Sequence, residues 1–338
     1  MNLIGYFNYH FGIAKNAHNL HNLLSKYNID HQIYNINTPA HAKNNNNIPT
    51  LNNINLLKNL INIFVLVDIL TLQQIIQQCQ KIKTSSTKFI LYYVQEVAGQ
   101  EADYHHIFTF FDKIIVPSLF VKTILDKYYS AVDYLPLVPI KSNFIEEIPY
   151  RNKIICLYIC DVHSCIYRKN INGYISLIER CDNPNYFFIL KINNLHYNKK
   201  LEQKLYNIEN KNFKLISHAL NNDDYNELMN ICDIYISLHR SEGYGLTIYE
   251  ATQKNKYILT TNYSAPREYL QNYSKFIEVN HTITNTNKFV NSPYSKYGAE
   301  WCEPDIEDCY HKLLYIEKNI PDIYKDFTRE KLVGIVNL

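Results

Sequence analysis

Residues 239–251 read HRSEGYGLTIYEA, and they join the end of an apolar, strand-like run to the start of a helical pattern. Two carboxylates, Glu242 and Glu250, stand on either side of the Gly-Tyr-Gly turn at 243–245. The chain has only 8 glycines in 338 residues, so two in one turn indicate a tight bend or a close approach to a ligand. The free amides that open the next helix form an anion site. The stretch therefore predicts a phosphate-holding loop between two acids that suit vicinal sugar hydroxyls.

The same spacing is also compatible with an ordinary surface loop in which Glu250 is an exposed helix residue. From the residues alone, the two interpretations stand side by side. The rest of the chain decides how the stretch is interpreted.

Composition describes a globular protein without a general electrostatic partner. Hydrophobic residues make up 46% and charged residues 20% of the chain, and its length suits two domains of about 150 residues. The net charge of +2 predicts no broad surface for nucleic acid or anionic membrane. Eight cysteines without metal-site spacing, no signal-like N-terminus and no long apolar segment predict a cytoplasmic protein with reduced core thiols.

Short apolar runs alternate with segments of helical period, which is typical of α/β domains with parallel sheets. The predicted strands are Asn2–Phe7, Asp30–Tyr34, Ile61–Val67, Lys88–Tyr93 and Lys113–Val116, then Ile154–Cys160, Tyr186–Lys191, Phe213–Ile216, Ile234–Leu238 and Tyr257–Thr260. The predicted helices are Ala14–Lys26, Thr71–Ile82, Leu119–Lys127, Asn170–Arg180, Asp224–Asn230 and Leu246–Lys254.

A proline-containing stretch without strand or helix period divides the two halves. We predict domains at 1–140 and 152–320, a linker at 141–151, and a C-terminal tail at 321–338. Two doubly wound domains would present the carboxyl ends of their strands to a shared cleft.

Several segments, in chain order, resemble the retaining GT-B glycosyltransferases of family GT4 (group 1). The region 234–251 resembles the carboxylate-x7-carboxylate motif of this family, and 257–269 and 301–307 resemble the segments that follow it. Upstream, 160–170 (CDVHSCIYRKN) resembles the Arg-Lys-Asn turn of one bacterial-type branch, and 2–17 resembles that branch's first strand and glycine-rich turn.

The resemblance implies a GT-B fold and the transfer of a sugar from a nucleotide diphosphate sugar to a glycan, lipid or protein acceptor. It implies no cofactor and no metal, because GT-B enzymes as a family do not need a metal bridge. Glu250 would bind the ribose, Glu242 the transferred sugar, and Lys169 with Arg168 the diphosphate. The remaining donor-binding residues implied are Gly12, Gly243, Tyr244, Gly245, Leu246 and Thr247.

The basic pair also carries a prediction of its own. Arg168 and Lys169 precede the predicted helix at 170–180, and a cation at a helix start opposes the helix dipole. We interpret the pair as an anion site, because a bound anion would offset that unfavourable placement.

The first half departs from the family in two places. Where the family has a histidine or a Trp-Glu pair after the fourth strand, this chain has Gln95 and Glu96; Glu96 is either an acceptor-side catalytic residue or a helix cap. Gly12 stands alone where the family often has two glycines. These departures leave open an alternative, a catalytically inactive GT-B scaffold that binds a sugar nucleotide or a protein partner. A dehydrogenase is disfavoured, since no Gly-x-Gly-x-x-Gly follows the first strand.

Overall fold

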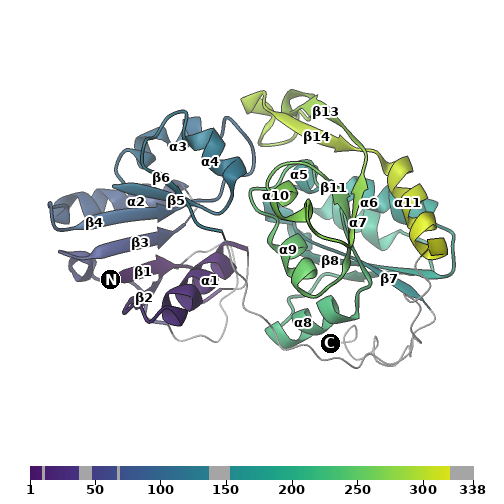
Figure 1. The fold of residues 1–338 in the computed structure, drawn as a ribbon, viewed down its shortest axis with the longest axis horizontal. Coiled ribbons are helices and arrows are strands. Elements are labelled where there is room, and N and C mark those ends of the chain that lie inside the picture. The colour runs from purple at the N-terminus through teal and green to yellow at the C-terminus, as the bar shows by residue number, and fades with distance from the viewer. Residues whose placement is uncertain (10–11, 38–47, 67–68, 137–152, 320–338) are drawn as a thin grey trace. The chain divides into compact units, whose positions relative to one another are not determined.

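A computed structural model describes residues 1–9, 12–37, 48–66, 69–136 and 153–319 of the chain. The chain divides into two compact units, Met1–Ile140 and Lys141–Leu338. The predicted linker at 141–151 and the predicted tail at 321–338 lie outside the described residues. Each unit is a layered α/β structure (Figure 1).

Unit 1 is built on a six-stranded parallel sheet in the order β2-β1-β3-β4-β5-β6. Its strands are β1 (Asn2–Gly5), β2 (Gln32–Asn35), β3 (Ile61–Val65), β4 (Lys88–Tyr92), β5 (Lys113–Val116) and β6 (Val132–Tyr134). Its helices are α1 (Gly12–Lys26), α2 (Ile69–Cys79), α3 (Glu101–Phe108) and α4 (Leu119–Leu125). Apolar runs such as Ile63-Phe64-Val65 are buried along their whole length, because helices cover a parallel sheet on both faces.

Unit 2 carries a second six-stranded parallel sheet in the order β12-β11-β10-β7-β8-β9. Its strands are β7 (Ile154–Asp161), β8 (Tyr186–Asn193), β9 (Phe213–Ile216), β10 (Ile234–Ser237), β11 (Tyr257–Thr261) and β12 (Phe276–Val279). Its helices are α5 (Ile166–Lys169), α6 (Ile171–Arg180), α7 (Lys199–Tyr206), α8 (Asn222–Ile231), α9 (Leu246–Gln253), α10 (Pro266–Leu270) and α11 (Ile306–Asn319).

Alternate residues of β7 enter two different cores, which makes unit 2 doubly wound. Ile154 and Cys156 pack in the core that α6 and α11 cover, whereas Ile155 and Leu157 pack in the core that α8 and α9 cover. This alternation follows from the two-residue period of a strand. Figure 1 shows the helices around the second sheet. The α/β class and the doubly wound sheets predicted from the sequence are confirmed.

The chain order of the second sheet reverses between β7 and β10. Strands β8 and β9 extend the sheet on one side of β7, and β10 to β12 extend it on the other. Loops that leave two neighbouring strands in opposite directions open a crevice at their carboxyl ends, which is where open α/β sheets bind ligands. The loops after β7 and β10 are therefore the first place to look for a site.

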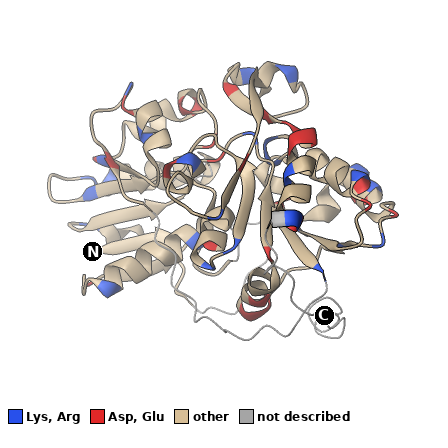
Figure 2. Ribbon diagram, turned by 45° about the vertical axis from the view of Figure 1, so that its right-hand side comes forward, with Lys and Arg blue, Asp and Glu red and all other residues tan. Residues whose placement is uncertain are grey.

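Several elements of the described residues were not predicted from the sequence. They are the helices α3, α5, α7, α10 and α11, the edge strands β6 and β12, and the antiparallel hairpin of β13 (His281–Asn285) and β14 (Glu300–Pro304). The eight cysteines are buried and free, as predicted. Within the described ranges, no helix is long and apolar enough to cross a membrane. Figure 2 shows acidic and basic residues interspersed over the helices and loops of each unit.

Candidate functional site

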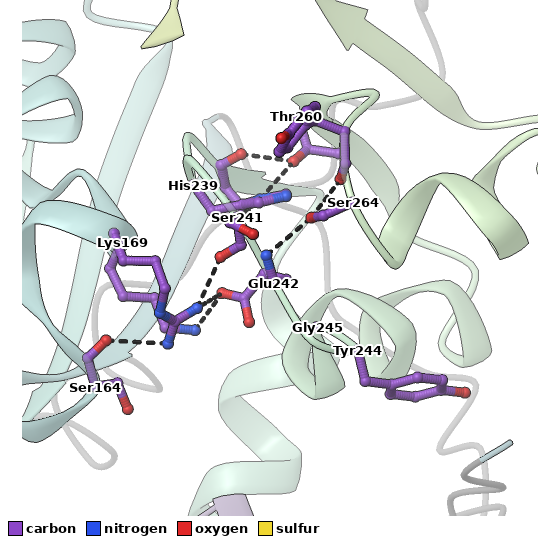
Figure 3. Close-up of polar contacts among 12 residues, drawn as sticks. Ser164, Lys169, His239, Ser241, Glu242, Tyr244, Gly245, Thr260 and Ser264 are labelled. Atoms are coloured by element: carbon purple, nitrogen blue, oxygen red, sulfur yellow. Dashed lines mark hydrogen bonds and ion pairs between the residues drawn. The ribbon is translucent and has the colours of Figure 1, made fainter. Parts of the chain in front are cut away.

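The site is centred on Glu242, in the loop that leaves β10. Its Oε1 atom lies 3.0 Å from Nη1 of Arg168 and also pairs with Nζ of Lys169 (Figure 3). Glu242 is 6% exposed and Arg168 1% exposed, whereas the Lys169 side chain keeps 15% of its surface accessible. Residues that are 73 positions apart in the sequence meet here, because β7 and β10 are neighbours in the sheet.

The two cations decide the charge state of Glu242. Burial alone would raise its pKa, but the charges of Arg168 and Lys169 outweigh burial and lower the pKa to about 2. Glu242 is therefore ionised at neutral pH, and the cluster of one acid and two bases carries a net positive charge. Such a cluster favours an anion at its open side, where Lys169 lies.

Backbone carbonyls fix the Arg168 guanidinium in the cluster. Nη1 donates to the carbonyl of Ser241 at 2.8 Å, and Nη2 donates to the carbonyl of Ser164 at 3.0 Å (Figure 3). Arg168 thus connects the loop after β7 to the loop after β10 while it neutralises Glu242. A fork-shaped donor suits this arrangement, because it reaches several acceptors from one plane.

Arg168 and Lys169 directly precede the helix predicted at 170–180, which the structure forms as α6, but they also end the four-residue helix α5, which was not predicted. Asn170, in the left-handed region at φ 51°, separates the two helices and caps α6 by accepting from the amide of Gly173 at 3.2 Å. The pair lies between the end of α5 and the start of α6, where the two helix dipoles act in opposite senses, so the dipole gives no reason for a bound anion. The case for an anion site rests on the net charge of the cluster instead.

The Gly-Tyr-Gly turn requires glycine at Gly245, the residue just before α9. Its φ is +78°, and a Cβ there would lie 2.9 Å from Oη of Tyr269 and 3.0 Å from Cγ of Pro266. Tyr269 also donates to the carbonyls of Tyr244 at 2.9 Å and Gly245 at 3.1 Å. The hydrogen bonds of Tyr269 thereby fix the turn. Gly243, which precedes Tyr244, is buried, and the amides of Leu246 and Thr247 lie in the first turn of α9.

A second anchor holds Glu242 from the loop after β11. The amide of Glu242 donates to Oγ of Ser264 at 2.8 Å, and the amide of Ala265 donates to the carbonyl of Glu242 at 3.2 Å. Both the backbone and the side chain of Glu242 are therefore fixed.

Glu250, the second acid of the motif, lies elsewhere in the same region. It is half-buried on α9, and Oη of Tyr225 on α8 donates to its Oε2 atom. Whereas two cations hold Glu242, Glu250 receives a neutral donor.

Arg240 is a site-building residue that sequence reasoning missed. Its Nε and Nη2 atoms donate to the two carboxylate oxygens of Glu303 at 2.6 Å each, and its guanidinium lies 4.5 Å from the ring centre of Phe289. Its Nη1 atom donates to the carbonyl of Tyr167, next to Arg168. Arg240 therefore ties the loop after β10 both to the β13–β14 hairpin and to α5. An arginine directly after a buried strand was the available signal.

His239 was also missed as part of the site. It is fully buried, and its Nδ1 atom lies 3.1 Å from Oγ of Ser237 and 3.3 Å from Oγ1 of Thr260. Burial lowers its pKa to about 4, so the imidazole is neutral at pH 7. His239 is therefore a neutral, buried polar residue of the loop that carries Glu242.

The other predicted site residues belong to unit 1. Gly12 is the first residue of α1, is exposed, and has open space where a Cβ would be, so the fold does not require glycine there. Gln95 is fully buried and donates to the carbonyl of Val97 at 2.9 Å and to Glu101 at 2.5 Å. Glu96 is half-buried in the loop between β4 and α3.

No group of three or more His, Cys, Asp or Glu side chains in the described parts of the chain is arranged to hold a metal ion. Asp223 and Asp224 lie in the first turn of α8, which Asn221 caps by accepting from the amide of Asp224 at 2.9 Å.

Comparison with known proteins places the site in a family context. Residues 146–292 match the family described as glycosyl transferases group 1, and this segment contains Arg168, Lys169, Glu242 and Glu250. A search of the curated proteins found no similar sequence.

Solved structures share the fold at low sequence identity. WaaG, a glycosyltransferase involved in lipopolysaccharide biosynthesis, is 14% identical with a TM-score of 0.58; the match covers 95% of this chain and 90% of WaaG. Anabaena HepE in complex with UDP and glucose is 12% identical with a TM-score of 0.53, covering 79% and 82%. S. aureus TarM is 14% identical with a TM-score of 0.52, and the match covers 83% of this chain and 56% of TarM. The chain thus spans little more than half of TarM, and it spans 44% of the pneumococcal O-GlcNAc transferase GtfA.

Proposed function

We propose that this GT-B chain, whose residues 146–292 match the group 1 glycosyl transferases, is a retaining, metal-independent glycosyltransferase of the GT4 type. Its donor would be a nucleotide diphosphate sugar, and its acceptor a glycan, a lipid or a protein. The observation that carries the proposal is the meeting of Arg168 and Lys169 with Glu242 where the strand order of the second sheet reverses.

In this proposal the basic pair binds the diphosphate. Lys169 is the partly exposed member, so its ammonium contacts the phosphate oxygens, while buried Arg168 holds Glu242 in place. The amides of Leu246 and Thr247 add donors at the start of α9. Charge that develops on the departing diphosphate is thereby stabilised by groups that are already oriented.

The two carboxylates take different hydroxyls. Glu242 is ionised and fixed, so it accepts hydrogen bonds from the transferred sugar without moving. Glu250 accepts from the ribose of the nucleotide. The reaction is a front-face displacement: the acceptor oxygen bonds to the anomeric carbon, the bond to the phosphate oxygen breaks, and the acceptor proton passes to that phosphate oxygen. Catalysis then consists mainly of positioning and charge stabilisation.

One observation favours the alternative of a binding scaffold without turnover. Gln95, which occupies a position where the family places a sugar-contacting residue, is fully buried and bonded to Glu101 and Val97. Glu96 then remains as the acceptor-side candidate. Both functions share the donor site, so donor binding and turnover need separate measurements.

Donor binding is tested by thermal shift with UDP, GDP, ADP and their sugar conjugates, on the wild type and on Lys169→Gln and Glu250→Gln. A ligand at 100 times its Kd stabilises a protein by about 2.7 kcal/mol, so one nucleotide should raise the melting temperature of the wild type clearly more than that of either variant. Asp224→Asn, in the first turn of α8, serves as the control charge deletion. Absence of any shift at millimolar nucleotide would contradict both functions.

Turnover is tested with the sugar conjugate of the nucleotide that binds. Release of free nucleotide on addition of an acceptor mixture, with a product whose anomeric configuration matches the donor by NMR, supports the retaining enzyme. Binding without release, at enzyme concentrations above the Kd, favours the scaffold.

A further inference from the structure

Tyr225 stands out among residues that neither the sequence motif nor the proposed chemistry uses. It lies on α8, and its phenol donates to Oε2 of Glu250 on α9. The two helices cover the same face of the second sheet, where Tyr225 packs against the core that contains Ile248 and Ala251 of α9. The contact therefore follows from the packing of two neighbouring helices.

The phenol fixes the orientation of the Glu250 carboxylate. The terminal torsion of a Glu side chain has only a broad, twofold preference, so the plane of a carboxylate is poorly defined by the chain itself. A hydrogen bond to one oxygen fixes that plane and aims the acceptor sites of the carboxylate. Burial raises the pKa of Tyr225 well above its usual value, so the phenol keeps its proton and remains a donor.

A cation at this position would act differently. Lys254, four residues after Glu250, donates from Nζ to Oδ1 of Asn230 at 2.8 Å, and its charge also acts on Glu250. The donor that α8 supplies to Oε2 of Glu250 is a neutral phenol, which orients the carboxylate without adding a charge. A ligand hydroxyl then meets a carboxylate whose acceptor oxygens point in a defined direction, the arrangement that gives strong hydrogen bonds.

We propose that Tyr225 is a positioning residue that sets how strongly the protein distinguishes a ribonucleotide from a deoxyribonucleotide, by orienting Glu250 toward the ribose hydroxyls. This inference rests on the proposed function, because it takes Glu250 as the ribose-binding residue. Tyr225 itself touches Glu250 and acts through it.

The experiment compares affinities for matched nucleotides by isothermal titration calorimetry. The probes are the nucleoside diphosphate among UDP, GDP and ADP that binds the wild type most tightly, and its 2′-deoxy and 3′-deoxy counterparts. The wild type should bind at least one deoxy form about tenfold more weakly, the effect of one lost hydrogen bond to a charged group. In Tyr225→Phe this ratio should fall to about threefold or less.

Two further variants separate positioning from general stability. Tyr273→Phe is the matched control: Tyr273 packs against the same core, and its phenol donates to the carbonyl of Lys256 at 2.6 Å, away from Glu250. It should keep the wild-type ratio. If Tyr225 acts through Glu250, the double variant Tyr225→Phe/Glu250→Gln should show the same ratio as Glu250→Gln alone.

The outcomes also separate this inference from the proposed function. A Tyr225→Phe variant that keeps the wild-type ratio, whatever its absolute affinity, overturns the inference and leaves the donor site standing. A wild type that binds the ribo and deoxy forms equally removes the ribose role of Glu250 and the inference with it. Failure of every nucleotide to bind the wild type overturns the proposed function itself. Loss of all binding in a Tyr225→Phe protein that melts like Tyr273→Phe supports the inference.

Discussion

The two carboxylates that bracket the Gly-Tyr-Gly turn are held in opposite ways. Glu242 is buried and forms ion pairs with Arg168 and Lys169, whereas Glu250 is half-buried and accepts a hydrogen bond from the phenol of Tyr225. The first arrangement is rigid and tied to the stability of unit 2. The second leaves a half-buried carboxylate on α9. One motif thus contains a buried ion cluster at one end and, in the proposed function, the ribose-binding carboxylate at the other.

The sharpest way to break this contrast is to remove the buried cation. Arg168→Met should destabilise unit 2 by about 3–5 kcal/mol, because it leaves the Glu242 charge buried with one partner fewer. Urea unfolding followed by the fluorescence of Trp301, the one tryptophan of the chain and a buried residue of unit 2, measures the loss. Lys169→Met, at the partly exposed cation, should lose less; equal losses would contradict a central role for Arg168.

Acid should weaken the Glu242 end selectively. The pKa of Glu242 is about 2 when folded and near its ordinary 4.5 when unfolded, so its contribution is complete above pH 4.5 and is lost as the pH falls toward 2. The size of the shift corresponds to about 3 kcal/mol. Urea unfolding followed by Trp301 fluorescence at each pH should show this fall in the free energy of unfolding in the wild type and not in Glu242→Gln. The same fall in the variant would show that Glu242 is not its source.

His239 should titrate in a separate window. Burial lowers its pKa from 6.5 to about 4, so the neutral ring stabilises the fold fully above pH 6.5, and that contribution is lost as the pH falls toward 4. The loss in this window should be about 3 kcal/mol, ahead of the Glu242 loss. In the variant His239→Asn, the free energy of unfolding should change little between pH 6.5 and 4 and should still fall steeply below pH 4. A flat wild-type curve above pH 4.5 would contradict the buried neutral state.

The turn between the two acids offers a smaller, purely steric test. Gly245→Ala places a Cβ on a backbone with φ +78° and 2.9 Å from Oη of Tyr269, so it should cost at least about 1–2 kcal/mol in urea unfolding. Gly12→Ala, where a Cβ would meet nothing within 4 Å, should leave stability unchanged. Similar losses at both glycines would show that the turn is not the strained element.

The sequence predicted the sheets well because their strands are continuous apolar runs, which only burial on both faces explains. β5 and β9 match the predicted ranges at both ends, and the other predicted strands differ by one or two residues at an end. The edge strands β6 and β12 were not predicted. The short helix α5, which Arg168 and Lys169 end, was missed because four residues carry no periodicity. The hairpin of β13 and β14 was missed because its pairing is non-local.

The site itself was half predictable. Glu242 and the Arg-Lys pair could be named from motifs, since each lies in one contiguous segment. Their partners could not: Arg240 meets Glu303 across 63 residues and Tyr225 meets Glu250 across 25, and no spacing rule links such pairs. Contacts of this kind depend on which strands are neighbours and on which helices cover one face.

The Glu250 end should be the least sensitive to change in stability. Glu250→Gln keeps an amide oxygen that accepts from Tyr225 and removes only the charge of a half-buried side chain, so the free energy of unfolding should change by about 0.5 kcal/mol or less. Urea unfolding followed by Trp301 fluorescence checks this beside Glu242→Gln. That variant leaves two cations without their carboxylate and should lose far more free energy of unfolding. If the two variants lose the same stability, the ends of the motif do not differ as described. If Glu250→Gln is neutral to folding yet weakens nucleotide binding, the second acid serves the ligand alone, and this separation of roles is what the contrast between a cation pair and a phenol predicts.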